Sequence, residues 1–394
     1  MKRKTLFLPL LSFVLLLTTG CDAFLPKVRS NRRSSSSELD EDISEINSEK
    51  SGSERSSRYY YSSEEYYPES SEYYPESSSE APINLAQTDD DSYVSYQLSS
   101  DGTYYIITGV TNNNFYAGKE LYLPSIHNGL PVKEIGESAF QNVNIGGIYI
   151  AEGITTMGAN AFGESTIQSA YIPSTLEELS FNAFAYSSLK KVVLSEGVKI
   201  LHQQCFIGCP MTQVILPSTI IDIGTSCFQN CYYLRDVTLN EGLKTINTLG
   251  FCRCESLRYI YIPASVTSMG AAFFDCHNLN IEFSPDNYSY KIKNNCLMSF
   301  DETALLEYFD TNYLETYQVA DNVRIIGMFC FAGSFIDTVV IKNTIDYIES
   351  GAFNGSRVRR IIFYGTDNEW SNVIRYSGPI SDVEEVVIAG PLGQ

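Results

Sequence analysis

Ten cysteines are the residues of this chain best suited to metal, redox or disulfide chemistry. Two pairs, Cys205 with Cys209 and Cys227 with Cys231, share a C-x₃-C spacing that brings two thiolates within reach of one metal ion. A zinc site needs about four ligands in total. No histidine or carboxylate recurs beside these pairs, so the sequence predicts no metal site.

Acid–base or nucleophilic catalysis would need a histidine near a nucleophile or a carboxylate. The three histidines, His127, His202 and His277, lie far apart in the sequence, and none has a serine or cysteine nucleophile signature beside it. The acidic pair Glu177-Glu178 fits a solvated turn. The sequence also has no glycine-rich phosphate loop, no calcium-binding nonapeptide array and no hydrolase elbow. We therefore expect no catalytic residue, no cofactor and no enzymatic activity.

A 22-residue period governs most of the chain and is marked by phenylalanines in a fixed phase. They are Phe140, Phe162, Phe184, Phe206, Phe228, Phe251, Phe273 and, after an interruption, Phe331 and Phe353. A small residue precedes nearly every one, and aliphatic residues or methionine recur about five and eight positions before it. Each unit is too small to bury its own apolar face, so stability must come from stacking one unit on the next.

A short strand is expected in every unit. Eight to eleven residues after each phenylalanine, apolar residues alternate, as in Val192/Leu194 and Ile260/Ile262. Alternation with a period of two predicts a half-buried strand. The stacked units should therefore share one short-stranded parallel β-sheet, with few or no long helices because Gly, Ser and Asn punctuate the rest of each unit.

The same period gives the cysteines a structural explanation. Cys205, Cys227 and Cys330 occupy the small position before a phenylalanine, and Cys209, Cys231, Cys254 and Cys276 lie three positions after one. A buried free cysteine behaves as a small hydrophobic residue, which suits both positions. Equivalent Cα atoms of neighbouring units should lie ~5 Å apart, within disulfide range. Free thiols and bonds such as Cys209–Cys231 or Cys254–Cys276 both remain open.

The repeat resembles the BspA-like leucine-rich repeats of bacterial surface proteins. Their units read roughly Ile-Pro-x-x-Val-x-x-Ile-Gly-x-x-Ala-Phe-x-x-Cys-x-x-Leu, and residues 216–234 read L-P-S-T-I-I-D-I-G-T-S-C-F-Q-N-C-Y-Y-L. The resemblance implies a leucine-rich-repeat, right-handed solenoid used for adhesion or ligand binding. It also implies a domain plan, with a β-hairpin cap at 93–131, repeat units at 132–283 and 319–363, an inserted β-hairpin at 284–318 and a C-terminal cap at 364–394.

The first 21 residues have the features of an export signal. Lys2, Arg3 and Lys4 precede an apolar run over 6–17, which is too short to cross a bilayer that needs ~20 residues. The ending Gly20-Cys21 resembles a bacterial lipoprotein signal, although Thr18 stands where that family usually has an apolar residue. The resemblance implies that residues 1–21 form a lipoprotein signal ending at a lipidated Cys21.

Residues 22–92 are expected to be a disordered acidic tether rich in Ser, Glu and Tyr. Positions 34–92 hold 16 acidic and 3 basic residues, and the segment Glu-Tyr-Tyr-Pro-Glu-Ser-Ser occurs twice in succession over 65–78. Few aliphatic side chains and a strong net charge leave too little burial to offset chain entropy. The tyrosine pairs fit either a simple spacer or a docking peptide.

The outward side of the predicted sheet is the candidate binding site. Its mid-strand positions are Tyr149, Tyr171, Val193, Ile215, Thr238, Tyr261, Glu282, Val340 and Ile362, and Tyr259 flanks them. Exposed contiguous apolar surface usually marks an interaction site, and tyrosine is a favoured anchor. We therefore expect Tyr149, Tyr171, Val193, Ile215, Tyr259 and Tyr261 to contact a ligand. The alternative is that β-branched and aromatic residues merely suit strands.

These features predict a lipid-anchored, extracytoplasmic protein on a bacterial cell surface that binds a protein or glycan on another cell or on a matrix. The membrane is then a partner only through the anchor. The net charge of −20 repels phosphate backbones and argues against nucleic acid. Two other roles remain open, a self-associating structural component of the envelope and an accessory that presents nutrients to a neighbouring transporter or enzyme.

Overall fold

The computed structural model describes residues 92–111, 118–276, 279–309, 312–375, 380 and 382–390. The chain divides into two units, 1–74 and 75–394, and every described residue belongs to the second. The predicted signal over 1–21, nearly all of the predicted tether over 22–92, and His277 lie outside the described residues. Within the described residues, no helix is both long and apolar enough to cross a membrane.

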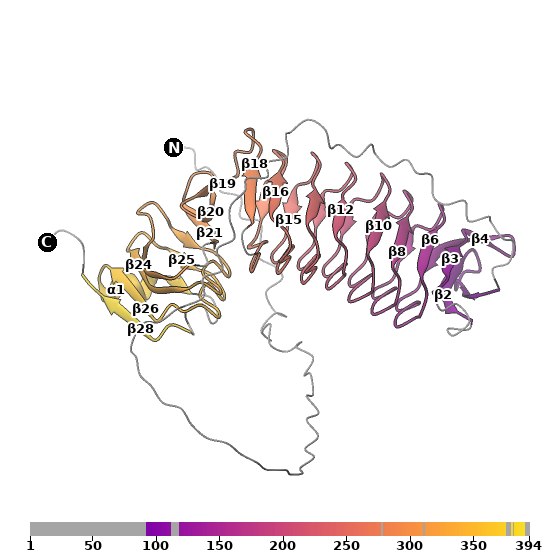
Figure 1. The fold of residues 1–394 in the computed structure, drawn as a ribbon, viewed down its shortest axis with the longest axis horizontal. Helices are drawn as coiled ribbons and strands as arrows, with labels where there is room; N and C mark the ends of the chain where they lie inside the picture. The colour runs from indigo at the N-terminus through magenta and orange to yellow at the C-terminus, as the bar shows by residue number, and fades with distance from the viewer. Residues whose placement is uncertain are drawn as a thin grey trace, which may run out of the picture. The chain divides into compact units, whose positions relative to one another are not determined.

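The described residues form a β-solenoid, as predicted, in which each unit contributes a strand to a row along one side (Figure 1). The row contains a parallel four-stranded sheet of β3 (Glu120–Leu123), β6 (Gly147–Ile150), β8 (Ser169–Ile172) and β10 (Lys191–Leu194). It continues as two parallel pairs, β12 (Gln213–Ile215) with β14 (Asp236–Thr238), and β16 (Tyr259–Ile262) with β18 (Asn280–Phe283). Period-two alternation in the sequence produces these strands because one face of each must be buried.

A second parallel ladder of short strands accompanies the first, which the sequence analysis did not anticipate. It begins with β5 (Leu130–Ile135) paired to β7 (Thr156–Met157), and continues as a separate five-stranded sheet of β9 (Glu178–Leu179), β11 (Ile200–Leu201), β13 (Asp222–Ile223), β15 (Thr245–Ile246) and β17 (Ser268–Met269). All but the first have two residues, too few to show an alternation. Their sequence signal is the aliphatic or methionine residue about five positions before each phenylalanine, which is the buried member of each strand.

The phenylalanines form a continuous spine inside the solenoid. From Phe140 to Phe273 successive rings are stacked with centroids 5.0–5.7 Å apart and planes within 6–13° of each other. Phe331 and Phe353 repeat this arrangement at 5.3 Å. The backbone N–H of each spine phenylalanine donates to the carbonyl oxygen of the residue that precedes the next spine phenylalanine, at 2.7–2.9 Å. Phe273 is the exception, and Phe353 is the last spine phenylalanine. The rings and this ladder stabilise the stack together.

Hairpins occur at two places along the array. The first pairs β1 (Val94–Leu98) with β2 (Tyr105–Val110), and β2 runs parallel to β5, which also pairs with β4 (Ile126–His127). The second lies between Phe273 and Phe331 and consists of β19 (Tyr290–Lys293), β20 (Cys296–Ser299) and β21 (Ala304–Tyr308), all antiparallel. β21 then runs parallel to the first short strand of the following units, β23 (Ile325–Ile326).

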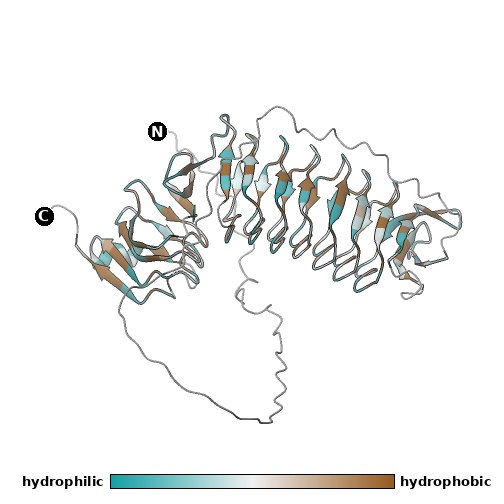
Figure 2. Ribbon diagram, viewed as in Figure 1, coloured by the Kyte–Doolittle hydropathy of each residue, from teal (hydrophilic) through white to brown (hydrophobic). Residues whose placement is uncertain are grey.

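The last units continue both ladders. The longer strands are β22 (Leu314–Gln318), β24 (Ile336–Lys342), β26 (Arg360–Tyr364) and β28 (Glu385–Ile388), and the shorter ones after β23 are β25 (Tyr347–Ile348) and β27 (Ile374–Arg375). The one helix among the described residues, α1 (Asp367–Asn372), begins with a capping box in which Thr366 and Glu369 satisfy each other's backbone N–H groups. Hydrophobic and hydrophilic residues alternate within the strands of successive turns, as Figure 2 shows.

The buried residues fall into two hydrophobic cores. The first runs from Val94 to Leu297, and the second from Cys296 to Val373. The second hairpin separates them, since Leu297 belongs to the first core while Cys296 and Met298 belong to the second. The array is therefore two stacked blocks, each with its own core, joined at the hairpin.

Candidate outer strand face

The third residue of each longer strand from β3 to β18 points away from the core. These residues, with the exposed Tyr259, make up what we call the outer strand face. Its members are Tyr122, Tyr149, Tyr171, Val193, Ile215, Thr238, Tyr259, Tyr261 and Glu282. The strands hold them in register, since Tyr122 is opposite Tyr149, Tyr149 opposite Tyr171, and Tyr171 opposite Val193. A paired backbone presents these side chains on a rigid surface.

Three tyrosines at the beginning of the face form a stack. The Tyr122 and Tyr149 rings lie 5.3 Å apart with planes at 14°, and the Tyr149 and Tyr171 rings 4.5 Å apart at 4°. Burial raises the pKa of Tyr149, with Tyr171 and Tyr122 adding to the effect, so its hydroxyl stays protonated at neutral pH. Because the rings cover each other's faces, the stack presents ring edges and hydroxyl groups outward.

Beyond the stack the face becomes aliphatic. Val193 is 38% exposed and Ile215 is 53% exposed, although their strand neighbours Leu194 and Val214 are buried. An isolated exposed aliphatic residue needs no explanation. Here two of them follow three tyrosines on consecutive units, which makes a contiguous apolar strip of the kind found at interaction sites.

The far end of the face carries two exposed tyrosines on one strand. Tyr259 is 47% exposed and Tyr261 is 37% exposed. The Tyr259 hydroxyl donates to a Glu282 carboxylate oxygen on β18 at 2.8 Å. Burial, followed by this contact with Glu282, raises the pKa of Tyr259 to about 12. The Glu282 carboxylate fixes the orientation of the ring, so this part of the face is preorganised.

Charged residues line both margins of the face. Exposed basic residues stand at or just before the beginning of the strands, namely Lys190, Lys191, Arg235 and Arg258. Beyond the ends of the strands lie Glu152, Glu196 and Glu241, each accepting hydrogen bonds from backbone N–H groups of the next unit. A polar margin around an apolar strip is the usual composition of a protein interface.

The structure places all six predicted contact residues, Tyr149, Tyr171, Val193, Ile215, Tyr259 and Tyr261, on the outer strand face. Their role in binding stays a prediction. The continuation expected at Val340 does not hold, because Val340 is only 8% exposed. Its strand β24 lies between β22 and β26, with Gln318 and Ile362 as its register neighbours.

Tyr122 was missed by the sequence analysis, which placed it in a cap outside the repeats. The signal was present, since residues 120–123 read E-L-Y-L and residues 147–150 read G-I-Y-I. Both segments place tyrosine between two buried aliphatic residues. The spacing of 27 residues, in place of 22, hid the correspondence.

The other candidate chemical groups do not converge. His202 Nε2 lies 2.9 Å from Glu178 Oε2, and the His202 ring packs on Phe181 at 4.8 Å. No serine or cysteine hydroxyl or thiol is hydrogen-bonded to His202 among the described residues. His127 stacks on Tyr96 at 3.8 Å. Across the described part of the chain, no group of three or more His, Cys, Asp or Glu side chains could hold a metal ion.

The described cysteines are all buried, and none of them forms a disulfide bond. The cysteines that lie three positions after a spine phenylalanine donate their S–H groups to a main-chain carbonyl of the preceding unit. The bonds are Cys209 to Phe184, Cys231 to Phe206, Cys254 to Phe228 and Cys276 to Phe251, at 3.0–3.3 Å. The thiols therefore serve as small buried hydrogen-bond donors in this structure. Neither Cys209 and Cys231 nor Cys254 and Cys276 are joined by a disulfide bond.

Comparison with solved structures finds the same fold in other bacterial proteins. A leucine-rich cell surface protein of Faecalibacterium prausnitzii aligns over 73% of this chain and 98% of its own, with 20% identity and a TM-score of 0.54. The pneumococcal vaccine antigen PcpA aligns over 75% and 97%, with 16% identity and a TM-score of 0.50. A leucine-rich repeat protein of Bacteroides ovatus aligns over 76% and 77%, with 18% identity and a TM-score of 0.50.

A comparison with curated protein sequences gives no match. The family model described as the BspA type leucine-rich repeat region matches six copies, over residues 108–234, 199–310 and 303–374. These matches cover most of the chain and include the spine phenylalanines from Phe140 to Phe353. The predicted family is thereby confirmed, and the chain belongs to the BspA-type leucine-rich repeat family.

Proposed function

We propose that this protein is a bacterial surface protein that binds a protein or glycan ligand through the outer strand face. The observation that carries the proposal is the outward-pointing strip of half-buried tyrosines (Tyr122, Tyr149 and Tyr171) and exposed aliphatic residues (Val193 and Ile215), followed further along the face by the exposed Tyr259 and Tyr261. A strand surface without a binding role would be expected to carry mainly Lys, Glu, Thr and Ser. The description of the Faecalibacterium protein as a cell surface protein supports the location.

The arrangement of the tyrosines favours some contacts over others. The stacked rings leave mainly edges and hydroxyl groups for a ligand, so Tyr149 and Tyr171 should bind through hydrogen bonds and edge contacts more than through ring faces. The aliphatic side chains of Val193 and Ile215 would add favourable free energy through the burial of their apolar surface against the ligand. Because all four lie on paired strands, little conformational entropy is lost on binding, and preorganisation of this kind raises affinity.

The test replaces Tyr149, Tyr171 and Tyr261 together by Ser in the full chain. Binding would be measured on a glycan array and on a panel of extracellular matrix proteins. Truncation of a true anchor costs ~2 kcal/mol or more, about a thirtyfold loss of affinity. A companion variant with the same three positions changed to Phe keeps the stack and removes the hydroxyl groups, so it separates hydrogen bonding from packing.

The matched control is the triple replacement of Tyr186, Tyr232 and Tyr233 by Ser. These tyrosines are 51%, 42% and 62% exposed and lie in the turns that follow the spine phenylalanines. We expect this control to bind as the wild type does. Retained binding by the first variant together with lost binding by the control would move the site to the turns. Concentration-dependent oligomerisation abolished by the first variant would identify a self-associating envelope component.

A further inference from the structure

The junction between the two blocks departs from the hydrogen-bond pattern of every other unit. By the pattern of the other units, the Phe273 N–H would donate to the carbonyl oxygen of Cys330, the residue before the next spine phenylalanine. That oxygen instead accepts a hydrogen bond from the Tyr308 N–H at 2.8 Å. The Phe273 N–H donates to the Glu307 side chain, at 3.2 Å from Oε2. A carboxyl group thus replaces the missing main-chain acceptor.

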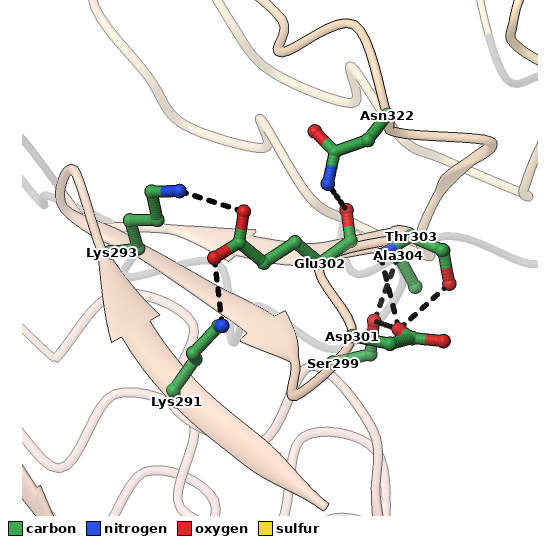
Figure 3. A network of polar contacts seen from close by, with 8 residues as sticks. All are labelled: Lys291, Lys293, Ser299, Asp301, Glu302, Thr303, Ala304 and Asn322. Carbon is green, nitrogen blue, oxygen red and sulfur yellow. Dashed lines mark hydrogen bonds and ion pairs between the residues drawn. The ribbon is translucent and has the colours of Figure 1, made fainter.

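Tyr308 also supplies an aromatic ring where no spine phenylalanine is present between Phe273 and Phe331. Its ring lies 5.9 Å from the Phe331 ring at an interplanar angle of 40°, so it packs tilted against the first spine ring of the second block. The same kind of turn also opens both blocks. Ser99 and Thr103 hydroxyl groups donate to Asp101 in the first hairpin, and Ser299 and Thr303 donate to Asp301 in the second (Figure 3). The second hairpin therefore starts a new block and does not simply interrupt one array.

Glu307 lies in apolar surroundings. It is 3% exposed and stands opposite Leu297 in the hairpin. A cavity of about 40 Å³ beside it is lined by Phe273, Phe274, Phe309, Phe329 and Ser334, among others. None of the described residues lining the cavity is cationic, and its acidic member Asp275 pairs with Arg253 at 3.1 Å. Ionised Glu307 would have one N–H donor and no counter-ion there.

The cavity also holds a second buried polar group. Ser334 is 4% exposed and its Oγ has no hydrogen-bond partner. A water molecule needs roughly 10–15 Å³ of such space and two or more polar partners. The cavity is large enough, and Glu307 and Ser334 supply polar atoms. The junction is therefore the place in the described solenoid where water can reach a buried carboxyl group between two cores.

We propose that Glu307 is a pH-controlled latch between the two blocks that meet at the second hairpin: its protonated carboxyl group keeps the two blocks packed together, and its ionisation loosens the junction. The neutral group satisfies the Phe273 N–H without placing a charge between Phe273, Phe274 and Phe329. The ionised group needs more hydrogen-bond donors than the Phe273 N–H and the small cavity beside it supply, so its full hydration requires the junction to open.

The direction of the pH dependence follows from burial. Desolvation raises the pKa of Glu307 from 4.5 to about 8, against a small opposing effect of the Phe273 N–H. The folded protein therefore binds one more proton than the unfolded chain between these values, so stability falls as pH rises from about 4.5 to 8. The stabilisation is fully present below pH 4.5 and is lost as pH passes through 8.

The other titratable groups packed at the junction have environments or partners of their own. Burial raises the pKa values of Cys296 to about 11 and of Cys330 well above its usual range, so both thiols stay neutral. Burial also raises the pKa of Tyr317, and Tyr308 is a buried phenol. Asp275 is held by Arg253, and Cys276 donates to a main-chain carbonyl. Glu349 accepts the Met328 N–H at 3.0 Å.

The test measures hydrogen exchange of the Phe273 amide in the full chain from pH 5 to 9, corrected for the intrinsic exchange rate. Because one proton is involved, we expect protection to fall by up to tenfold per pH unit between pH 5 and 8, and to level off above 8. The Phe251 amide is the internal reference, since it donates to a main-chain carbonyl and not to a titratable group.

Two variants sharpen the result. Glu307→Gln keeps a carbonyl acceptor but cannot ionise, so its Phe273 protection relative to Phe251 should vary less than twofold over the same range. Glu302→Gln is the matched control in the same hairpin. Hydrogen bonds from Lys291 and Lys293 lower the pKa of Glu302 to about 2, so the control should keep the wild-type profile (Figure 3).

A wild-type ratio of Phe273 to Phe251 protection that does not change with pH would overturn the proposal, even if Glu307→Gln failed to fold. The same conclusion would follow if Glu307→Gln folded and kept the wild-type pH dependence. Infrared difference spectroscopy gives an independent readout. The wild type should lose one protonated carboxyl band between pH 6 and 9, and Glu307→Gln should not.

Discussion

At the scale of single residues, the cysteines show how a repeat can use a reactive group as a structural one. The position three residues after a spine phenylalanine is Cys in four consecutive units. In the two units before them the same position is Ser165 and Ser187. Ser165 Oγ donates to the Phe162 carbonyl of its own unit at 2.7 Å, whereas Cys209 donates to the Phe184 carbonyl of the preceding unit at 3.1 Å. Both residues supply a small donor, and Cys also adds apolar volume to the core.

Burial should make these thiols unreactive. It raises the pKa of Cys209 to about 12, and those of Cys205, Cys227 and Cys231 well above their usual range. The thiolate is the reactive species. At pH 8 we therefore expect the folded protein to react with a thiol reagent at least about a hundredfold more slowly than the unfolded protein.

The measurement counts reactive thiols in a Cys21→Ser variant before and after addition of denaturant. The nine described cysteines should appear only after unfolding. Fewer than nine thiols in the unfolded, non-reduced protein would show that some of them are paired in disulfides. Rapid labelling of the folded protein would show that the solenoid opens locally.

At the scale of elements, the same set of side-chain hydrogen bonds links every second unit to the unit after it, a pairing that is not evident from the 22-residue period. Glu152 accepts the backbone N–H groups of Ser174 and Thr175, and the Gly153 N–H donates to the Thr175 hydroxyl. Glu196 and Gly197 repeat these contacts with Ser218 and Thr219, as do Glu241 and Gly242 with Ala264 and Ser265. The three glycines have φ values of +105° to +125°, which disfavour side chains.

The phenylalanine spine is the element on which stacking depends most. Phe228 is fully buried and stacks between Phe206 and Phe251. Its replacement by Ala should cost ~3–5 kcal/mol, because neighbouring units cannot collapse into the space of the ring. Denaturant unfolding followed by far-ultraviolet circular dichroism would give the change in the free energy of unfolding.

Phe181→Ala is the matched control for Phe228→Ala. Phe181 is 49% exposed and lies in a turn against His202, so its loss should cost much less. Equal losses of stability in the two variants would contradict the internal spine. A loss confined to part of the transition would indicate that the two blocks unfold separately.

At the scale of the whole molecule, the proposed surface location depends on residues outside the described part of the chain. We predict that Cys21 is lipidated and becomes the mature N-terminus. Diacylglycerol would supply two acyl chains, and stable anchoring generally takes more than one. A Cys21→Ser variant should therefore move from the detergent phase to the aqueous phase on detergent partition. Unchanged partition would mean that the protein is held at the membrane by another part.

The sequence by itself determined the family, the solenoid, the spine and the half-buried strands. This was achievable because each unit contacts mainly its neighbours, so the environment of Phe228 or Tyr261 depends on residues one period away. A fixed spacing in the sequence then becomes a fixed spacing in space. The assignment of Tyr149 and Val193 to an outward face followed from strand alternation alone.

Only the tertiary structure decided the features that break the period. Tyr122 joins the tyrosine stack across an irregular spacing, and Val340 is covered although its strand has the same alternation as the others. Glu307 reaches Phe273 across 34 residues of chain. These contacts join segments with no common spacing, and they depend on how the second hairpin folds between two cores. A periodic pattern holds no information about such contacts, because the period ends where they begin.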